Sequence, residues 1–323
     1  MKPLTLIIPN YNGAHLLARN LPSVLKAAEQ YNGPARVLIV DDGSTDASCE
    51  VLRAQFPEVA VVVHEKNRGF AEAIATGVHH AETELLFLLN SDVELHVGCL
   101  EKLEPYFKSP EVFSVCPLML DEDGSVNRHS WNLRSYRRGY LKLVDWDIET
   151  ARTLRRKAYL PCLYSSGGSM MVSKAKFVTL GGFHPIYKPF YGEDFDLGLR
   201  AWYRGWPNYF EPQATLTHQS QGSIKDAFKR SRVKQIRRRN RYFIEWIHMP
   251  LARLMGSTLP FTLLQLCGEL LLFDRVNLKG FVTALAALPE TLAARHALKE
   301  GQVLTLDHVI ETTLSASRLE TTT

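Results

Sequence analysis

Acidic and polar side chains directly follow two apolar runs in the first third of the chain. Residues 37–40 (VLIV) run into Asp41-Asp42-Gly43-Ser44, and residues 85–89 (LLFLL) run into Asn90-Ser91-Asp92. If both runs are parallel strands, their carboxyl ends meet at one edge of a sheet, where open α/β sheets bind ligands. Carboxylates at that edge suit a nucleotide and a divalent cation. The sequence therefore predicts a ligand site there.

These acidic groups have different predicted tasks. Asp41 and Asp42, on a turn that Gly43 permits, can accept hydrogen bonds from a base or ribose. Asp92, with Glu94 two residues on and His218 much later, offers ligands to Mg²⁺ or Mn²⁺, which favour oxygen and keep phosphate oxygens in their shell. Each of these features also has a purely structural explanation. Asp41 and Asp42 could form an ordinary Asp-Gly turn, Asp92 and Glu94 could be surface acids, and His218 could be a structural histidine.

A third acidic pair, Glu193-Asp194, precedes a helix-like stretch that reaches Trp202. One of these carboxylates could take a proton from an attacking hydroxyl while its neighbour holds the geometry, because a general base must reach its proton at hydrogen-bond distance. The alternative is an acidic first turn that favours the helix dipole. The pair is a candidate for catalysis.

The elements that must position these residues are strands joined by crossover helices. Continuous Val/Ile/Leu runs predict buried parallel strands at residues 4–8, 37–40, 59–64 and 85–89. Helix-forming composition predicts helices at residues 14–30, 47–55 and 70–81. Residues 117–163 are less regular and predict a small antiparallel patch with an acceptor loop. The predicted fold class is α/β, with a mixed, mostly parallel Rossmann-like sheet and flanking helices.

After His218 the chain changes character. Residues 225–241 hold nine basic residues against Asp226, so a local charge of +8 lies on a mildly acidic body. Residues 237–247 predict a basic amphipathic helix, and residues 254–273 are apolar with an uncharged part of 15 residues. Because a bilayer span needs about 20 residues, we expect interfacial helices, with packing on the body and true insertion as alternatives. The predicted domains are 1–223 and a helical extension, 224–323, with a polar tail.

Composition is that of an ordinary globular protein of 323 residues with a net charge of +4. The five cysteines are spread widely without a Cys-x-x-Cys pair, so neither a disulfide framework nor a zinc site is predicted. The apolar run at residues 4–8 leaves no room for a secretion signal, so we expect a cytoplasmic catalytic domain. The basic and apolar segment at 225–273 predicts attachment to an anionic membrane surface on the inner face, not to nucleic acid.

Seven sequence blocks, in order, resemble the family 2 glycosyltransferases, inverting enzymes of the GT-A fold, over residues 3–223. The blocks are residues 8–12 (IPNYN), 40–46 (VDDGSTD), 67–70 (NRGF), 89–93 (LNSDV), 167–169 (GGS), 181–183 (GGF) and 193–196 (EDFD). Within the family, the chain is most similar to the bacterial rhamnosyltransferase-like branch that builds surface polysaccharides.

The resemblance implies a role for each matching residue. Asp194 would be the catalytic base beside Glu193, and Asp92 would hold the metal with help from Glu94 or His218. The nucleotide would lie among Pro9, Tyr11, Asn12, Asp41, Asp42, Arg68 and Ser91. Gly167 and Gly168 would let the backbone approach the donor, and Trp202, with Trp131, Tyr136 and Trp206, could contact sugar or lipid or pack in the core.

The resemblance also implies the substrates: a nucleotide-sugar donor, dTDP-rhamnose-like before UDP- or GDP-sugars, and a glycan or polyprenyl-linked acceptor. One departure is Asn90, where many relatives carry an acid, so Asp92 has fewer carboxylate neighbours. A sugar nucleotidyltransferase is a second reading, but the turn after the first strand, residues 9–13 (PNYNG), lacks a basic phosphate loop. A third is an inactive membrane-binding module. The oligomeric state is not predicted.

Overall fold

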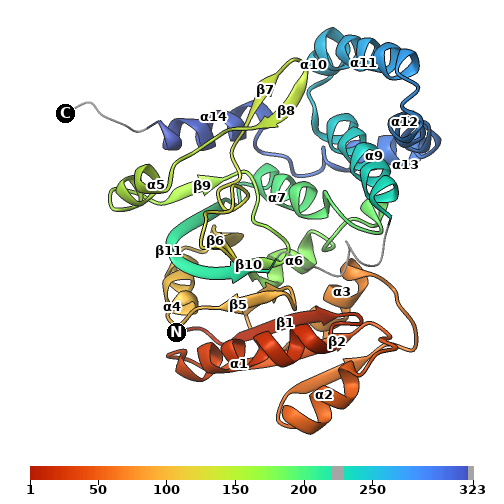
Figure 1. Cartoon of the computed structure of the whole chain (residues 1–323). Coiled ribbons are helices and arrows are strands. Elements are labelled where there is room, and N and C mark those ends of the chain that lie inside the picture. Colours follow the sequence, from red (N-terminus) through yellow and green to blue (C-terminus); the bar gives the residue numbers. More distant parts are fainter. Residues whose placement is uncertain (220–228, 319–323) are drawn as a thin grey trace.

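A computed structural model describes residues 1–219 and 229–318, and Figure 1 follows the chain through them. The first part alternates strands and helices in this order: β1 (Leu4–Asn10), α1 (Ala14–Gln30), β2 (Ala35–Asp41), α2 (Ser48–Gln55), β3 (Ala60–Val63), α3 (Phe70–His80), β4 (Leu85–Leu89), β5 (Val93–Leu95), α4 (Cys99–Leu103), η1 (Glu104–Lys108) and β6 (Ser114–Asp121). This alternation confirms the predicted strands and helices of the first 90 residues to within two residues at most ends.

The middle of the chain adds a small hairpin and returns to the sheet. Its elements are β7 (Arg134–Arg137), β8 (Tyr140–Leu143), α5 (Ile148–Arg155), β9 (Leu160–Cys162), β10 (Ser169–Ser173), α6 (Lys174–Thr179), η2 (Pro185–Tyr187), α7 (Glu193–Tyr203) and β11 (Asn208–His218). The antiparallel pair of β7 and β8 is the small patch that the irregular composition predicts.

Among the described residues the main sheet has the order β3-β2-β1-β4-β10-β6-β11-β5, and β9 pairs with β11. The pairs β2–β3, β1–β2, β1–β4 and β6–β11 are parallel, whereas β10 runs antiparallel to both β4 and β6. The sheet is therefore mixed and mostly parallel, as predicted. The carboxyl ends of β1, β2 and β4 lie at one edge, because Asn10 pairs with Asp41 in register.

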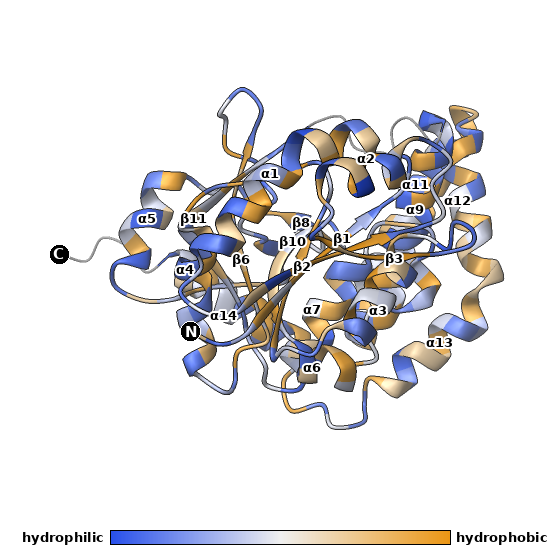
Figure 2. Cartoon of the chain, turned by 90° about the horizontal axis from the view of Figure 1, so that it is seen from below, coloured by the Kyte–Doolittle hydropathy of each residue, from blue (hydrophilic) through white to orange (hydrophobic). Residues whose placement is uncertain are grey.

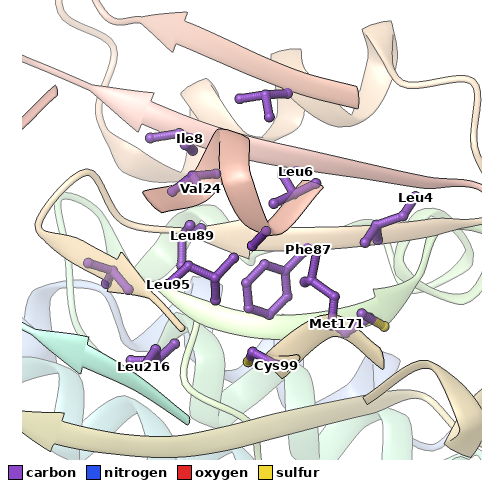
Figure 3. Close-up of a cluster of buried hydrophobic side chains, with 14 of the residues drawn as sticks. Leu4, Leu6, Ile8, Val24, Phe87, Leu89, Leu95, Cys99, Met171 and Leu216 are labelled. Carbon is purple, nitrogen blue, oxygen red and sulfur yellow. The ribbon is translucent and has the colours of Figure 1, made fainter. Parts of the chain in front are cut away.

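Helices cover both faces of this sheet. Leu4, Leu6 and Ile8 of β1 pack toward α1, and Figure 3 shows them with Phe87 and other members of this core. Ile7, on the opposite face of the same strand, packs with the apolar side chains of α3, α6 and α7. Burial on both faces explains why these strands read as continuous apolar runs. In Figure 2 the strand labelled β1 is largely orange, whereas α1 carries both colours.

The C-terminal region is helical. It contains α9 (Arg230–His248), α10 (Leu251–Arg253), the π-helical segment η3 (Leu254–Thr258), α11 (Leu259–Leu271), α12 (Arg275–Ala286), α13 (Leu288–Ala297) and α14 (Leu306–Ser317). The last helix returns to the catalytic part, where Leu306, Val309 and Ile310 share a core with Leu163 and Leu199. The polar tail of the predicted extension is thus helical as far as Ser317. The predicted boundary at 223/224 lies outside the described residues.

Candidate active site

The loops after β1 and β2 are bound to each other by hydrogen bonds. Asp41 is buried and accepts from Asn10 Nδ2 at 2.8 Å and from Ser44 Oγ at 2.7 Å. Asn12 Oδ1 accepts from Thr45 N at 2.7 Å, and Asn12 N donates to Ser44 Oγ at 2.9 Å. The two loops therefore form one rigid rim. Pro9 and Tyr11, both half-buried, lie on this rim at the end of β1.

Asp42 organises the next loop. Its Oδ1 accepts from Arg68 N at 2.9 Å and lies 2.7 Å from His64 Nδ1, and its Oδ2 accepts from Gly69 N at 2.7 Å. The Arg68 side chain is exposed, with its guanidinium 3.6 Å from Glu72. Asp42 thus brings Arg68 to the same rim as Asp41, which is where the sequence predicts the nucleotide.

The Asp92 loop lies beside this rim and brings two of the three predicted metal ligands together. Asp92 is buried, and His218 Nε2 at the end of β11 is 3.6 Å from its Oδ2. The antiparallel ladder of β5 and β11 fixes this approach by pairing Val93 with His218. Glu94 is exposed and lies opposite Thr217. Over residues 1–219 and 229–318, no three His, Cys, Asp or Glu side chains form a metal-binding group, so Glu94 does not join the pair.

Asn20 of α1 holds this loop in place, although the sequence reasoning did not single it out. Its Nδ2 donates to the carbonyl of Ser91 at 2.9 Å, and its Oδ1 accepts from Gln219 Nε2 at 2.7 Å. Gln219 N also donates to the carbonyl of Asp92 at 2.8 Å. A polar residue on the buried face of an amphipathic helix was the available signal, because buried polar side chains need partners.

Glu193 and Asp194, the acid pair, form the start of α7. Asp194 Oδ1 accepts from Phe195 N at 2.8 Å, and Oδ2 accepts from Gly167 N at 3.3 Å. Glu193 Oε2 is buried without a hydrogen-bond partner in the described part of the chain. Burial, and then the charge of Asp194, raise the pKa of Glu193 to about 8. Burial also raises the pKa of Asp194, so both carboxyls are stronger bases than in water.

Two adjacent glycines join the acid pair to the Asp92 loop. Gly167 N donates to Asp194, while the carbonyl of Gly168 accepts from Asn90 N at 2.9 Å. The Asn90 side chain lies flat against Gly168, where an added Cβ would be only 2.4 Å from Asn90 Nδ2. A continuous path of short contacts therefore connects the acid pair with Asp92, two residues beyond Asn90. Three predicted site segments meet here.

Comparison with known proteins agrees with this arrangement. Residues 5–179 match the family model described as glycosyl transferase family 2. The chain belongs to this glycosyltransferase family. It is 27% identical over 235 residues to an N-acetylglucosaminyl-diphospho-decaprenol L-rhamnosyltransferase of Mycobacterium tuberculosis (strain ATCC 25618 / H37Rv), covering 67% of this chain and 75% of the relative. It is 33% identical over 95 residues to an undecaprenyl-phosphate 4-deoxy-4-formamido-L-arabinose transferase of Edwardsiella ictaluri (strain 93-146), covering 28% and 29% of the two chains.

Two solved structures share the fold of this glycosyltransferase. One is GalNAc-T7 with UDP, GalNAc and Mn²⁺, with a TM-score of 0.60, 19% identity and coverage of 78% of this chain and 49% of that one. The other is the mannosyltransferase PcManGT from Pyrobaculum calidifontis in complex with GDP-Man and Mn²⁺, with a TM-score of 0.52, 19% identity and coverage of 98% and 86%. The chain thus spans about half of the first structure and most of the second. The GT-A-like fold is confirmed.

Trp202 of the glycosyltransferase lies in the core instead of a substrate pocket. Its indole is buried among the side chains that α7 packs against α14, and Nε1 donates to the carbonyl of Cys162 at 2.9 Å. Trp131 is also buried, with Nε1 donating to the carbonyl of Pro161 at 2.9 Å. Both tryptophans are therefore core residues. Tyr136 is half-buried on the β7–β8 hairpin, and Trp206 packs at the edge of the core that Ile7 forms with α3, α6 and α7.

Arg134 and Asp196 are functional candidates that the sequence reasoning missed. The Arg134 guanidinium lies 5.3 Å from the Phe195 ring centroid and donates to Tyr164 Oη at 2.9 Å, so a cation lies near the acid pair. Asp196 is buried and accepts from Arg200 Nε at 2.7 Å. Burial alone would raise the pKa of Asp196, but Arg200 and His248 hold it well below its usual range. The i,i+4 spacing of Asp196 and Arg200 was the available signal.

The basic segment contacts the protein itself more than we expected. Arg238 is buried and forms an ion pair with Glu269 of α11. Arg241 lies 3.3 Å from Glu245, and Arg237 stacks 4.4 Å from the Tyr191 ring centroid. These three cations therefore have partners within the protein, whereas Lys229, Arg230, Arg232 and Lys234 are exposed at the start of α9. Lys225 and Asp226 lie outside the described residues.

Proposed function

We propose that this glycosyltransferase inverts the anomeric centre of a nucleotide-sugar while transferring the sugar to a glycan or lipid-linked glycan in surface polysaccharide synthesis. The observation that carries the proposal is the contact path from Asp194 through Gly167 and Gly168 to Asn90. It places a general-base candidate next to the loop that holds Asp92. The general base and the leaving-group site must lie on opposite sides of one sugar. This contact path fixes how far Asp194 lies from the Asp92 loop.

The chain's own residues carry the proton movement. Asp194 takes the proton of the acceptor hydroxyl as its oxygen bonds to the anomeric carbon, while the bond from that carbon to the nucleoside diphosphate breaks. Burial and the charge of Asp194 raise the pKa of Glu193, which favours its neutral form and so disfavours a second negative charge beside the base. Because bond making and breaking occur in one displacement, the configuration inverts.

A divalent cation fits the donor set at Asp92. Asp92 supplies a hard oxygen ligand and His218 an imidazole nitrogen 3.6 Å away, and Mg²⁺ or Mn²⁺ needs only one or two protein ligands when phosphate and water complete its shell. Such a cation would supply Lewis-acid stabilisation of the leaving diphosphate. Both solved neighbours are structures with Mn²⁺, which supports this assignment.

We assign the nucleotide to the rim that joins the ends of β1 and β2. Pro9, Tyr11 and Asn12 line one side, Asp41, Asp42 and Arg68 the other, and Ser91 borders the Asp92 loop. The hydrogen bonds of Asp41 and Asp42 keep this rim rigid, which lowers the entropic cost of binding a ligand. A dTDP-rhamnose-like donor is favoured by the mycobacterial rhamnosyltransferase relative, with UDP- and GDP-sugars as alternatives.

We further propose a polyprenyl-linked acceptor and a position on the cytoplasmic face of the membrane. Within the described residues, one helical stretch, Leu251–Leu271, is long and apolar enough to cross a bilayer, and only 17% of its most apolar window is buried. Two relatives are named for decaprenol- and undecaprenyl-linked sugars, which supports the same acceptor class.

Donor turnover tests the proposal. Purified wild type and Asp194→Asn would be given dTDP-, UDP- and GDP-sugars with and without Mn²⁺, and both hydrolysis and transfer would be measured. We expect one donor to be used, and Asp194→Asn to lower transfer by roughly 10²- to 10⁴-fold. No turnover of any donor, or full transfer by Asp194→Asn, would contradict the mechanism. Formation of a nucleotide-sugar from a nucleoside triphosphate would instead support a nucleotidyltransferase.

A further inference from the structure

Two irregular pieces of backbone meet at the tip of the β7–β8 hairpin. Arg138 has a left-handed backbone with φ of 51°, and Gly139 follows with φ of 74°. Hairpin turns of this kind favour Asn-Gly, because a long side chain in the left-handed region is strained. The facing element is η3, a π-helical segment, and Thr258 Oγ1 donates to the carbonyl of Gly139 at 2.7 Å. Figure 1 shows the hairpin reaching up to α10.

A cavity of about 390 Å³ lies between these two pieces, and we call it the hairpin cavity. Its lining includes Tyr136, Arg138, Arg253, Ser257, Thr258 and Phe261. Arg253 lies 3.2 Å from Asp307 and 3.9 Å from the Tyr136 ring centroid. In the described part of the chain Arg138 has no ion-pair partner, so the cavity retains positive charge. Phosphate oxygens match the guanidinium donors and the Ser257 hydroxyl, whereas the Thr258 hydroxyl already donates to Gly139.

An outward apolar surface borders the hairpin cavity. Leu251, Met255 and Phe261 are exposed beside it, and further along α11 the side chains of Leu264 and Leu271 are 68% and 79% exposed. The opposite face of α11 docks on the protein through the Glu269–Arg238 pair and through Gln265, whose Oε1 accepts from Tyr140 Oη at 3.2 Å. Because its polar face is held by the protein, the helix presents its leucines outward as an interfacial helix does.

We propose that the hairpin cavity binds the headgroup phosphate of an anionic bilayer lipid while the outer face of Leu251–Leu271 enters the interface. This inference rests on the membrane association proposed above and gives it a specific lipid site. It assigns the decisive cation to Arg138 instead of to Arg238 and Arg241 of α9, which pair with Glu269 and Glu245. Arg134, at the start of β7, lies near the acid pair, so roughly 13 Å of strand separates the lipid phosphate from the catalytic region.

Vesicle co-flotation of the full chain tests this site. Wild type should bind phosphatidylcholine vesicles containing phosphatidylglycerol more tightly than phosphatidylcholine alone. Arg138→Asn should weaken binding to the anionic vesicles about fivefold, since one basic residue near such a surface contributes about that much. Asn tolerates a left-handed backbone, so this variant keeps the turn. Arg138→Lys should bind more tightly than Arg138→Asn.

Arg137→Gln is the matched control. It removes the same charge one residue away, from an exposed side chain that does not line the hairpin cavity. We expect it to bind almost as wild type does. Equal losses in Arg137→Gln and Arg138→Asn would mean diffuse attraction and would overturn the proposal, as would equal binding of wild type to both vesicle types. Release from vesicles by excess glycerol phosphate at constant ionic strength would overturn the lipid assignment in favour of a soluble phosphate ester.

Donor hydrolysis in the same preparations separates this inference from the proposed function. Arg138→Asn should hydrolyse the nucleotide-sugar in solution as wild type does, because the hairpin cavity lies outside the nucleotide rim and the acid pair. Reduced hydrolysis by this folded variant would contradict a purely lipid-binding role. Absence of hydrolysis by wild type would contradict the proposed function while leaving the vesicle results valid.

Discussion

At the scale of single residues, the site depends on charges kept out of water. Glu193 and Asp194 are adjacent, burial raises the pKa of each, and the charge of Asp194 raises that of Glu193 further. A carboxyl with a pKa of about 8 binds its proton more tightly in the folded chain than in the unfolded one. Its contribution to stability is therefore present at low pH and is lost as the pH rises from its ordinary value of 4.5 through about 8.

This linkage predicts the behaviour of Glu193→Gln. The variant cannot ionise at this position, so it should gain melting temperature relative to wild type as the pH rises from 5 to 9. Thermal melts of both proteins across that range would measure the difference. Glu94→Gln, at an exposed carboxyl, should show a constant difference from wild type. A constant difference for Glu193→Gln as well would mean that Glu193 titrates normally.

Gly168→Ala tests the contact between the acid pair and the Asp92 loop. The new Cβ would lie 2.4 Å from Asn90 Nδ2, so the loop must move, and such overpacking costs about 1–3 kcal/mol of unfolding free energy. Urea unfolding would measure the cost, and transfer activity should fall with it. Gly167→Ala is the matched control for stability, because its Cβ would make only ordinary contacts at 3.4 Å. Adding Asn90→Ala should restore the stability of Gly168→Ala; no restoration would place the strain elsewhere.

At the scale of elements, α1 does more than cover the sheet. Asn20 on its buried face fixes the backbone of Ser91 and the end of β11, and so sets the approach of Asp92 to His218. A helix that begins at the nucleotide rim thus also supports the predicted metal site. Asn20 thereby adds side-chain hydrogen bonds to the β5–β11 ladder that already joins the two loops.

Asn20→Ala should therefore weaken the apparent affinity for the metal without abolishing transfer activity. We expect the Mn²⁺ concentration for half-maximal transfer to rise about tenfold, as for other residues that orient metal ligands. Unfolding free energy should fall by about 1–3 kcal/mol, because buried polar partners lose their bonds. Metal titrations of transfer and urea unfolding measure the two effects. Lys26→Ala, exposed on the same helix, should leave both unchanged; an unaltered Mn²⁺ requirement in Asn20→Ala would contradict its positioning role.

The sequence predicted local elements well and distant pairings poorly. α1 has the predicted bounds, 14–30. Each local element is encoded by consecutive residues with its own hydrophobic pattern, so a helix can be distinguished from the strands on either side of it. The antiparallel insertion of β10 between β4 and β6 joins residues between 56 and 88 positions apart, and periodicity does not encode such pairings. The acid pair was predictable from its type and place, whereas Arg134 needed the hairpin's three-dimensional position.

At the scale of the whole molecule, the C-terminal helices are part of the catalytic body. Val309 and Ile310 of α14 pack with Leu163, which directly follows β9, and with Leu199 of α7. Asp196 on α7 also lies 2.9 Å from His248 Nε2 at the end of α9. Within the described residues, the part before residue 223 and the helical extension after it therefore share hydrophobic cores.

Ile310→Ala should destabilise the catalytic part although it lies near the C-terminus. Removing a buried isoleucine side chain costs about 2–5 kcal/mol, and the loss should lower the melting temperature of the whole chain in one transition. Glu311→Ala, at the exposed neighbouring position, should change the free energy of unfolding by no more than about 0.5 kcal/mol. A separate early transition in Ile310→Ala, with donor hydrolysis retained above it, would indicate that α14 is dispensable.

The return of α14 to the body also sets the order in which the enzyme can mature on the ribosome. Residues 4–89 hold their own strand and helix units and can order as they emerge, because domains fold progressively during synthesis. The core around Leu163 waits for Val309 and Ile310, which are synthesised well after Leu163 and Leu199. During that interval the outward leucines of α11 are already synthesised and exposed. This apolar surface can therefore form before the core around Leu163 is complete.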